Sequence, residues 1–156
     1  NKKGIKNIHL DLIGDGASQD FLQELTRKYN LEDSINFLGL KSREFVFNNL
    51  KNYDLLVQPS IYEGFGLTVV EAMLAKVPVL VSENDGPIEI IQSGKFGYYF
   101  TLESIEDLVS EIELILRDYS SKQMIEKVDD AYNYAKNTFD ITRTAERYFL
   151  EYKTID

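Results

Sequence analysis

Two glutamates and two glycines lie close together near the middle of the chain, in the segment Glu63-Gly64-Phe65-Gly66-Leu67-Thr68-Val69-Val70-Glu71. Glycines allow a ligand to approach the backbone closely, and a helix that begins at about Gly66 offers N–H groups and a favourable dipole to an anion. The loop therefore suits a phosphate, and Glu63 could accept hydrogen bonds from sugar hydroxyl groups beside it. The alternative is a solvated turn with an acidic residue near a helix N-terminus, which the helix dipole favours in any case.

The helix expected over about residues 66–76 carries the second glutamate. Apart from Lys76 at its end, only Thr68 and Glu71 interrupt its apolar residues, so we expect the helix to be buried. Thr68 and Glu71 are three residues apart and therefore lie on one side of the helix. A buried carboxylate is costly without a hydrogen-bond donor, and either a protein donor or a ligand hydroxyl group would satisfy Glu71. Its position alone leaves both roles open.

Short apolar runs alternate with helical patterns along the chain, and these elements must position the glutamates and glycines. We expect strands over residues 7–13, 35–38, 54–58, 78–82 and 97–100, and helices over residues 18–29, 43–50, 86 onward, 105–117, 122–136 and 142–153. The alternation predicts an α/β, Rossmann-like fold, in which an open parallel sheet carries helices on both faces and the chain ends in helices. Such sheets bind ligands at the carboxyl ends of their strands, where both glycine pairs are expected.

Length, composition and charge exclude several classes of protein. A chain of 156 residues with 44% apolar residues is long enough for a single globular domain with a core. The formal net charge of −9 argues against general binding of nucleic acid, which relies on Lys and Arg to neutralise phosphates. The absence of Cys and the single His exclude a disulfide framework and a cluster of thiolate or imidazole ligands. No apolar run approaches the roughly 20 residues that span a bilayer.

The segment from Ser60 to Met73 resembles the donor-binding motif of the retaining group 1 glycosyltransferases, family 4 of the GT-B fold. Glu63 and Glu71 have seven residues between them, which is the paired-glutamate spacing of that family. Other motifs follow in the family's order over roughly residues 8–150, namely the Gly-Asp-Gly turn at 14–16, Asn36–Gly39, Asp54–Ser60, Pro78-Val79, Gly86–Glu89 and Ser93–Gly97. The resemblance implies that residues 1–156 are one nucleotide-sugar-binding domain, the C-terminal half of a GT-B enzyme.

The resemblance also implies roles for individual residues. Glu63, the catalytic residue by this reading, would bind hydroxyl groups of the transferred hexose, and Glu71 would bind the hydroxyl groups of the ribose. The donor would also contact Gly14, Gly16, Gly64, Phe65, Gly66, Leu67 and Thr68, with the backbone of Leu38, Gly39 and Leu40 at the base. Leu67 and Thr68 would present N–H groups to the diphosphate, and the turn at Gly14 and Gly16 would lie near the phosphates.

The implied reaction is transfer of a hexose with retention at the anomeric carbon, through an oxocarbenium-like transition state. The family needs no divalent metal and no other cofactor, and this chain has no Asp-X-Asp pair that could hold one. The expected partners are a nucleotide sugar and an acceptor glycan, lipid or protein, the latter bound by an N-terminal domain absent here, and no nucleic acid is expected. We expect a cytoplasmic location, with the inner face of the membrane as an option for a full-length protein.

The chain departs from the family pattern in two respects, and two alternative functions remain open. The Arg and Lys that neutralise the diphosphate belong to a first strand–helix unit that is missing here, and Lys76 stands where the family often has Gly. A nucleotide-sugar epimerase on the same fold and a non-catalytic nucleotide-binding module are the alternatives. A dinucleotide oxidoreductase is disfavoured because the turn at Gly14 lacks a full Gly-X-Gly-X-X-Gly. His9 lies in an expected buried strand, which favours a structural role.

Overall fold

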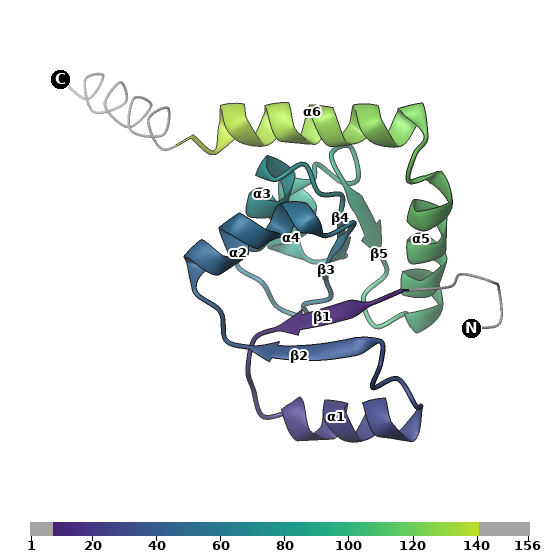
Figure 1. Ribbon diagram of the computed structural model, residues 1–156. Helices are drawn as coiled ribbons and strands as arrows, with labels where there is room; N and C mark the ends of the chain where they lie inside the picture. Colours follow the sequence, from purple (N-terminus) through teal and green to yellow (C-terminus); the bar gives the residue numbers. More distant parts are fainter. Residues whose placement is uncertain (1–7, 141–156) are drawn as a thin grey trace. The chain divides into compact units, whose positions relative to one another are not determined.

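A computed structural model describes residues 8–140, which form five β-strands, six α-helices and one 3-10 helix (Figure 1). Their contacts divide the chain into two compact units, of which the first ends at Val46 and the second begins at Phe47. The helix expected over residues 142–153, with its tyrosines 148 and 152, lies outside the described residues.

The first unit is built on two parallel strands, β1 (Leu10–Ile13) and β2 (Ile35–Gly39), which α1 (Gln19–Lys28) connects. The chain then enters α2 (Arg43–Asn49). Ser42 precedes the expected helix and is predicted from the sequence as its N-cap; the N–H of Phe45 donates to Ser42 Oγ at 3.1 Å, which confirms this prediction.

The prediction of a buried first strand is wrong. β1 begins at Leu10 rather than at residue 7, and the side chains of Leu10 and Ile13 are each 42% exposed. His9 precedes the strand and is exposed, so the expectation of a buried structural histidine is wrong as well. Within the described residues β1 pairs only with β2, in a two-stranded sheet. An apolar run indicates a strand, but it does not report which of its faces and edges are covered.

The second unit contains a three-stranded parallel sheet in the order β3 (Leu56–Gln58), β4 (Val79–Ser82), β5 (Tyr98–Phe100). Between these strands the chain forms α3 (Leu67–Leu74) and α4 (Asp85–Ile90), and the 3-10 helix η1 (Leu50–Asn52) precedes β3. All four residues of the central strand β4 are buried, which explains its uninterrupted apolar run. The parallel strands with helices on both faces confirm the predicted α/β, Rossmann-like fold class, although the described strands form two sheets rather than one.

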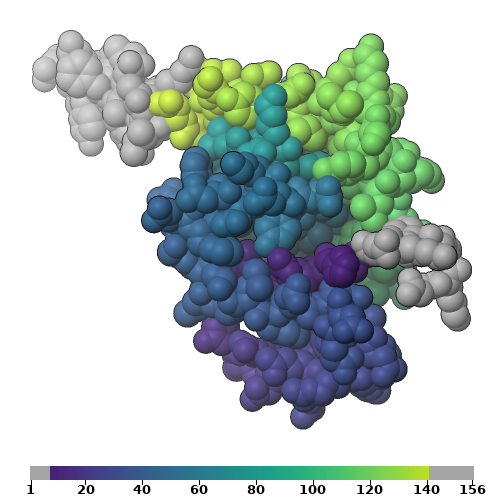
Figure 2. All heavy atoms as spheres, viewed as in Figure 1, coloured from purple at the N-terminus to yellow at the C-terminus, as the bar shows by residue number. Residues whose placement is uncertain are grey.

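Two helices close the described chain, α5 (Ile105–Asp118) and α6 (Lys122–Thr138). Each begins at a serine whose Oγ accepts a backbone N–H, at 3.2 Å in α5 and 3.1 Å in α6. Helix α6 packs against α3, and Figure 2 shows its atoms, in yellow-green, directly against the teal atoms of the middle of the chain. The side chain of Tyr134 stacks on Phe96 at a centroid distance of 4.3 Å, which confirms the packing role expected for this tyrosine.

Two helix ends differ in detail from the sequence expectation. Helix α3 ends at Leu74, and Lys76 follows with φ +58°, so the left-handed backbone considered for this position is present. Helix α4 begins at Asp85 with Asn84 as N-cap, so Pro87 occupies the third helical position rather than the first. The Asn84 side chain does not cap the helix and instead donates to Ser60 O and Ser82 Oγ at the strand ends.

Replacing Gly97 with Ala is expected to destabilise the second unit. A Cβ atom at this position would lie 2.7 Å from Val79 Cγ2 and 2.8 Å from Ile91 Cγ2, both in the packed interior. The resulting overpacking should lower the free energy of unfolding by about 1–3 kcal/mol, measured by denaturant unfolding. Gly64→Ala is the matched control, because a Cβ there meets no atom within 4 Å. Equal stability of the two variants would contradict the tight packing at Gly97.

Candidate functional site

The loop between β3 and α3 lies beyond the carboxyl end of β3 and leads into the first turn of the helix. Gly66 is the N-cap of α3 and has φ +87°, a conformation that side chains with a Cβ rarely adopt. A Cβ on Gly66 would also lie 3.3 Å from Pro87 Cγ. Glycine at this position is therefore a requirement of the local backbone and of its packing against α4.

Glu63 connects the two ends of this loop through both of its carboxylate oxygens. Gln58 Nε2 donates to Glu63 Oε2 at 3.0 Å, and the N–H of Gly66 donates to Glu63 Oε1 at 3.2 Å. The half-buried carboxylate is thus fixed between the end of β3 and the start of α3. A carboxylate can accept about four hydrogen bonds, so each oxygen keeps capacity for a ligand hydroxyl group. The contact with the Gly66 N–H supports the helix-start interpretation of Glu63, and its binding of a ligand stays a prediction.

The first turn of α3 presents the remaining residues of the motif. Helix geometry leaves the N–H groups of Leu67 and Thr68 without an acceptor inside the helix. Glu71 is half-buried one turn further along, on the same side as Thr68. The helix is less buried than predicted, because Leu67 is 59% exposed while Val69 is fully buried. An apolar helix buries only the faces against which other elements pack, and the sequence does not show which faces those are.

The sequence leaves two roles open for Phe65, a ring that faces a ligand or a ring that packs against the fold, and the structure shows packing. Its ring contacts Phe139 edge to face, with centroids 5.8 Å apart and planes at 86°. The side chain is nevertheless 46% exposed, so part of the ring remains accessible. The Phe139 ring also contacts Tyr134, which links the loop to the end of α6.

A second glycine supports the loop from α4. An ideal Cβ on Gly86 would lie 2.7 Å from Glu63 O and 2.9 Å from Gly64 C and O. The N-terminal turn of α4 therefore lies directly against the backbone of the glutamate. No Cβ-bearing residue fits at position 86 without displacing this backbone. Sequence reasoning assigned Gly86 to a helix start and to a family motif, and did not foresee its contact with Glu63.

Four polar residues at the ends of β3 and β4 form a network that sequence reasoning missed. The fully buried Ser82 donates from Oγ to Ser60 O at 2.6 Å. Asn84 Nδ2 donates to the same Ser60 carbonyl and to Ser82 Oγ, the latter at 3.1 Å. Ser82 Oγ also approaches Gln58 O at 3.4 Å, and the Gln58 side chain extends the network to Glu63. The available signal was that both apolar strand runs end in a polar residue, Gln58 in one and Ser82 in the other.

Two oxygen atoms of this network are buried without a hydrogen-bond partner among the described residues. They are Gln58 Oε1 and Asn84 Oδ1. In both side chains the NH2 group is turned toward oxygen acceptors, which leaves the carbonyl oxygen facing the interior. An unsatisfied buried acceptor typically costs about 1–3 kcal/mol, so these two orientations carry a cost that other contacts must offset.

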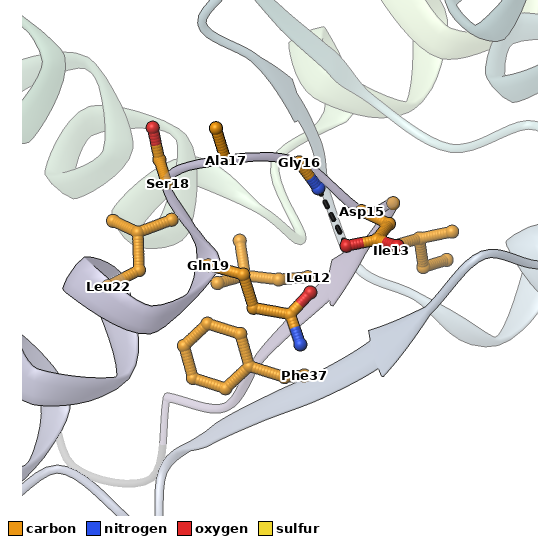
Figure 3. A pocket seen from close by; sticks show the side chains of 10 residues that line it. Leu12, Ile13, Asp15, Gly16, Ala17, Ser18, Gln19, Leu22 and Phe37 are labelled. Atoms are coloured by element: carbon orange, nitrogen blue, oxygen red, sulfur yellow. Dashed lines mark hydrogen bonds between the residues drawn. The ribbon is translucent and has the colours of Figure 1, made fainter.

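The donor-site residues predicted in the first unit lie around the turn that follows β1. The N–H of Gly14 donates to Gly39 O at 3.0 Å, so the glycine turn and the segment assigned to the base are in direct contact. A cavity of about 300 Å³ lies over this turn (Figure 3), and it is lined by Leu12, Ile13, Gly14, Asp15, Gly16, Ala17, Ser18, Gln19, Leu22 and Phe37. Leu40 is 77% exposed and is not part of the lining. Glu63 and Glu71 belong to the second unit.

Two shifted pKa values belong to the packing of α6 on β5. Burial lowers the pKa of Lys127, whose Nζ donates to Gly94 O at 2.5 Å and to Gly97 O at 3.2 Å. Burial also raises the pKa of Tyr98, over whose ring Lys127 Nζ lies at 4.7 Å from the centroid. The hydrogen bonds of Lys127 hold the segment before β5 in place.

Residues 8–140 contain neither a candidate metal site nor a candidate membrane span. No three His, Cys, Asp or Glu side chains in this range are grouped so that they could hold a metal ion. No helix of the same range has the length and apolar character needed to cross a membrane.

Comparison with known proteins relates the chain to one family. The model of the family described as glycosyl transferases group 1 matches residues 1–138. Protein CapJ from Staphylococcus aureus is 31% identical over 152 residues, which cover 96% of this chain and 37% of CapJ. The chain therefore spans little more than a third of the length of that relative.

Solved structures share the fold. HepE from Anabaena, in a complex with UDP-glucose, has a TM-score of 0.82 at 24% identity, over 96% of this chain and 42% of HepE. The C-terminal domain of LpcC from Francisella tularensis, described as a glycosyl transferase group 1 family protein, has a TM-score of 0.69 at 24% identity. That match covers 81% of this chain and 66% of the LpcC domain.

Proposed function

The chain belongs to the group 1 glycosyl transferases, and we propose that it binds the donor in an enzyme that transfers a hexose from a nucleotide diphosphate sugar. The transfer retains the anomeric configuration, as the resemblance to the family 4 motif implies. HepE, which was solved with UDP-glucose, supports a nucleotide sugar as the ligand. A glycan, lipid or protein acceptor would bind to a further domain, so that the chain described here supplies the donor side of the reaction.

The observation that carries this proposal is the geometry of Glu63. Its carboxylate is fixed beside the first N–H groups of α3, by Gln58 at one end and by Gly66 at the other. A sugar diphosphate needs hydrogen-bond acceptors for its hydroxyl groups and donors for its phosphates. The loop offers both within one turn of backbone, because Glu63 has unused acceptor capacity and the N–H groups of Leu67 and Thr68 point out of the helix start.

The chemistry follows from this arrangement. The N-terminal end of α3 stabilises the negative charge that develops on the departing diphosphate, through its N–H groups and the helix dipole. Glu63 orients the hexose by accepting from its hydroxyl groups and favours the positive charge that develops at the anomeric carbon. Glu71 accepts from the ribose hydroxyl groups one turn further along. No step requires Glu63 to move a proton, so the residue is not assigned as a general base.

Titration of the chain with uridine, guanosine and adenosine diphosphates and with their glucose conjugates tests the proposal. At least one nucleotide should bind in calorimetry, and its sugar conjugate should be bound differently from the bare diphosphate. The complete protein that carries this sequence should then release or transfer the sugar. The absence of binding by all six compounds would overturn the proposal. Binding without turnover by the complete protein would favour the non-catalytic nucleotide-binding module.

Replacing Glu71 with Ala is expected to weaken binding of the bare diphosphate and of the sugar nucleotide by the same factor. Hydrogen bonds to a charged group contribute about 1.5–3 kcal/mol each, so the affinity should fall by roughly 10-fold or more. Calorimetric titration of both ligands measures the effect. Glu106→Ala, an exposed glutamate in α5, is the control and should leave both affinities unchanged. A loss confined to the sugar nucleotide would contradict contact between Glu71 and the ribose.

A further inference from the structure

We propose that Gln58 is a positioning residue for the transfer reaction, because its side-chain amide holds the carboxylate of Glu63 in the orientation that the hexose requires. The inference rests on the proposed function and assigns to it a residue outside the Glu63–Glu71 motif. Gln58 is the last residue of β3, five residues before Glu63.

The first support is that Gln58 and Gly66 act on different oxygens of the same carboxylate. Gln58 Nε2 lies 3.0 Å from Glu63 Oε2, and Gly66 N lies 3.2 Å from Glu63 Oε1. One donor at each oxygen fixes both the direction of the carboxylate and the rotation of its plane. Without Gln58, only the Gly66 N–H would remain, and the carboxylate could rotate about that single hydrogen bond.

The second support is the cost of the Gln58 orientation. Only Nε2 of the amide can donate to a carboxylate, so the contact with Glu63 determines which way the amide is turned. Gln58 Oε1 then occupies a buried position without a partner among the described residues. A glutamine that served packing alone would gain by satisfying both ends of its amide. The unsatisfied oxygen indicates that the amide is retained for its contact with Glu63.

The third support is the rigidity of the strand end that carries Gln58. Its backbone pairs with Val81 of the fully buried strand β4. Ser82 Oγ donates to Ser60 O at 2.6 Å and approaches Gln58 O at 3.4 Å, and Asn84 donates to the same Ser60 carbonyl. The amide of Gln58 therefore extends from a backbone that pairs with the buried strand β4 and contacts the side chain of Ser82. The sheet thereby fixes the position of Gln58, and the hydrogen bond from Gln58 fixes the orientation of the Glu63 carboxylate.

Two substitutions at position 58 separate positioning from folding. Gln58→Leu keeps much of the side-chain volume and removes the donor, whereas Gln58→Glu introduces a carboxyl group that faces Glu63. At about pH 8 that carboxyl group is ionised and repels Glu63, but toward about pH 5 its protonated form can donate an O–H hydrogen bond to the Glu63 carboxylate. Gln58→Glu should thus recover activity relative to the wild type as the pH falls, and Gln58→Leu should not.

The experiment measures kcat/KM for release or transfer of glucose from UDP-, GDP- and ADP-glucose by the complete protein, together with calorimetric affinity for the bare diphosphates. We expect Gln58→Leu to lower kcat/KM by roughly 10- to 100-fold, since a small misplacement of a positioning group has effects of this size. Affinity for the bare diphosphate should stay within about twofold, since Gln58 is assigned to the sugar side. Gln123→Leu and Gln123→Glu, on the exposed side of α6, are the matched controls and should behave as the wild type.

The outcomes distinguish this inference from the proposed function. If the wild-type protein binds none of the nucleotides and releases no sugar, the proposed function fails and the inference falls with it. If the wild-type protein is active and Gln58→Leu retains full kcat/KM, or if both Gln58 variants show the wild-type pH profile, the positioning role is overturned while the function stands. NMR of the Gln58 side-chain amide gives a readout without ligand: its proton signals should shift in Glu63→Ala, and unchanged signals would contradict the contact.

Discussion

Glu63→Ala is expected to lower kcat/KM for sugar transfer by roughly 100- to 1000-fold, the range found when one preorganised electrostatic contact to a transition state is removed. The substitution deletes the acceptor for the hexose hydroxyl groups and the negative charge near the anomeric carbon. Affinity for the bare nucleotide diphosphate should change much less, because that ligand has no hexose. Steady-state kinetics of the complete protein and calorimetry with the diphosphate measure the two effects.

The difficulty with this variant is that Glu63 also binds the N–H of Gly66 at the start of α3. Glu63→Gln addresses it, since the amide oxygen can still accept from Gly66 while the negative charge is lost. A large loss in both variants assigns the effect to the carboxylate, because Glu63→Gln keeps one acceptor oxygen for Gly66 and loses the charge and the second acceptor oxygen. Glu126→Gln, an exposed glutamate in α6, is the matched control. If Glu63→Gln were fully active, or if both variants lost diphosphate binding as strongly as transfer, the assignment of Glu63 to the sugar would be wrong.

Gly86→Ala is the second substitution with a large expected effect, although Gly86 needs no contact with the donor. The added Cβ would lie 2.7 Å from Glu63 O and 2.9 Å from Gly64 O, and these backbone atoms can move only with the whole loop. The loop and Glu63 should shift by several tenths of an ångström, which we expect to lower kcat/KM by roughly 10- to 100-fold. The free energy of unfolding should also fall by about 1–3 kcal/mol.

Gly97→Ala separates these two effects of Gly86→Ala. A Cβ on Gly97 meets Val79 Cγ2 at the same distance of 2.7 Å, but its contacts are core side chains rather than the Glu63 loop. Both variants should lose stability in denaturant unfolding. Below the unfolding transition, Gly97→Ala should keep the specific activity of the wild type, and Gly86→Ala should not. Similar activity of the two variants would show that Gly86 serves stability alone.

Local features of the fold were accessible from the sequence because they depend on residues within one or two turns of each other. Ser42 begins α2 as predicted, since its hydroxyl group is within reach of a backbone N–H three residues away. Lys76 has a left-handed backbone because it lies just after the end of α3, where helices commonly end on a residue of this conformation. The parallel strand–helix pattern likewise rests on local apolar periodicity, and it led to the correct fold class.

Exposure and long-range contacts were not accessible in the same way. The apolar run at Leu10 and Ile13 resembles the run of β4, yet the first is partly exposed and the second is fully buried, because only β4 has a strand on each side. The helix residue Leu67 is exposed for a related reason, since no described element covers that side of α3. The apolar area of a side chain determines how much free energy its burial would contribute. The neighbouring elements determine whether the side chain is buried.

For the candidate site, the sequence by itself determined the residue types and their order: a glutamate, two glycines, a helix start and a second glutamate eight residues after the first. Only the tertiary structure decided what holds them. Ser82 lies 22 residues from its acceptor Ser60, and Gly86 lies against the backbone of Glu63, although the chain separates them by a whole strand–helix unit. Such contacts depend on the pairing of β3 with β4, which brings distant strand ends to one edge. The physical reason is that hydrogen bonds and steric exclusion act over a few ångströms in space, whatever the distance along the chain.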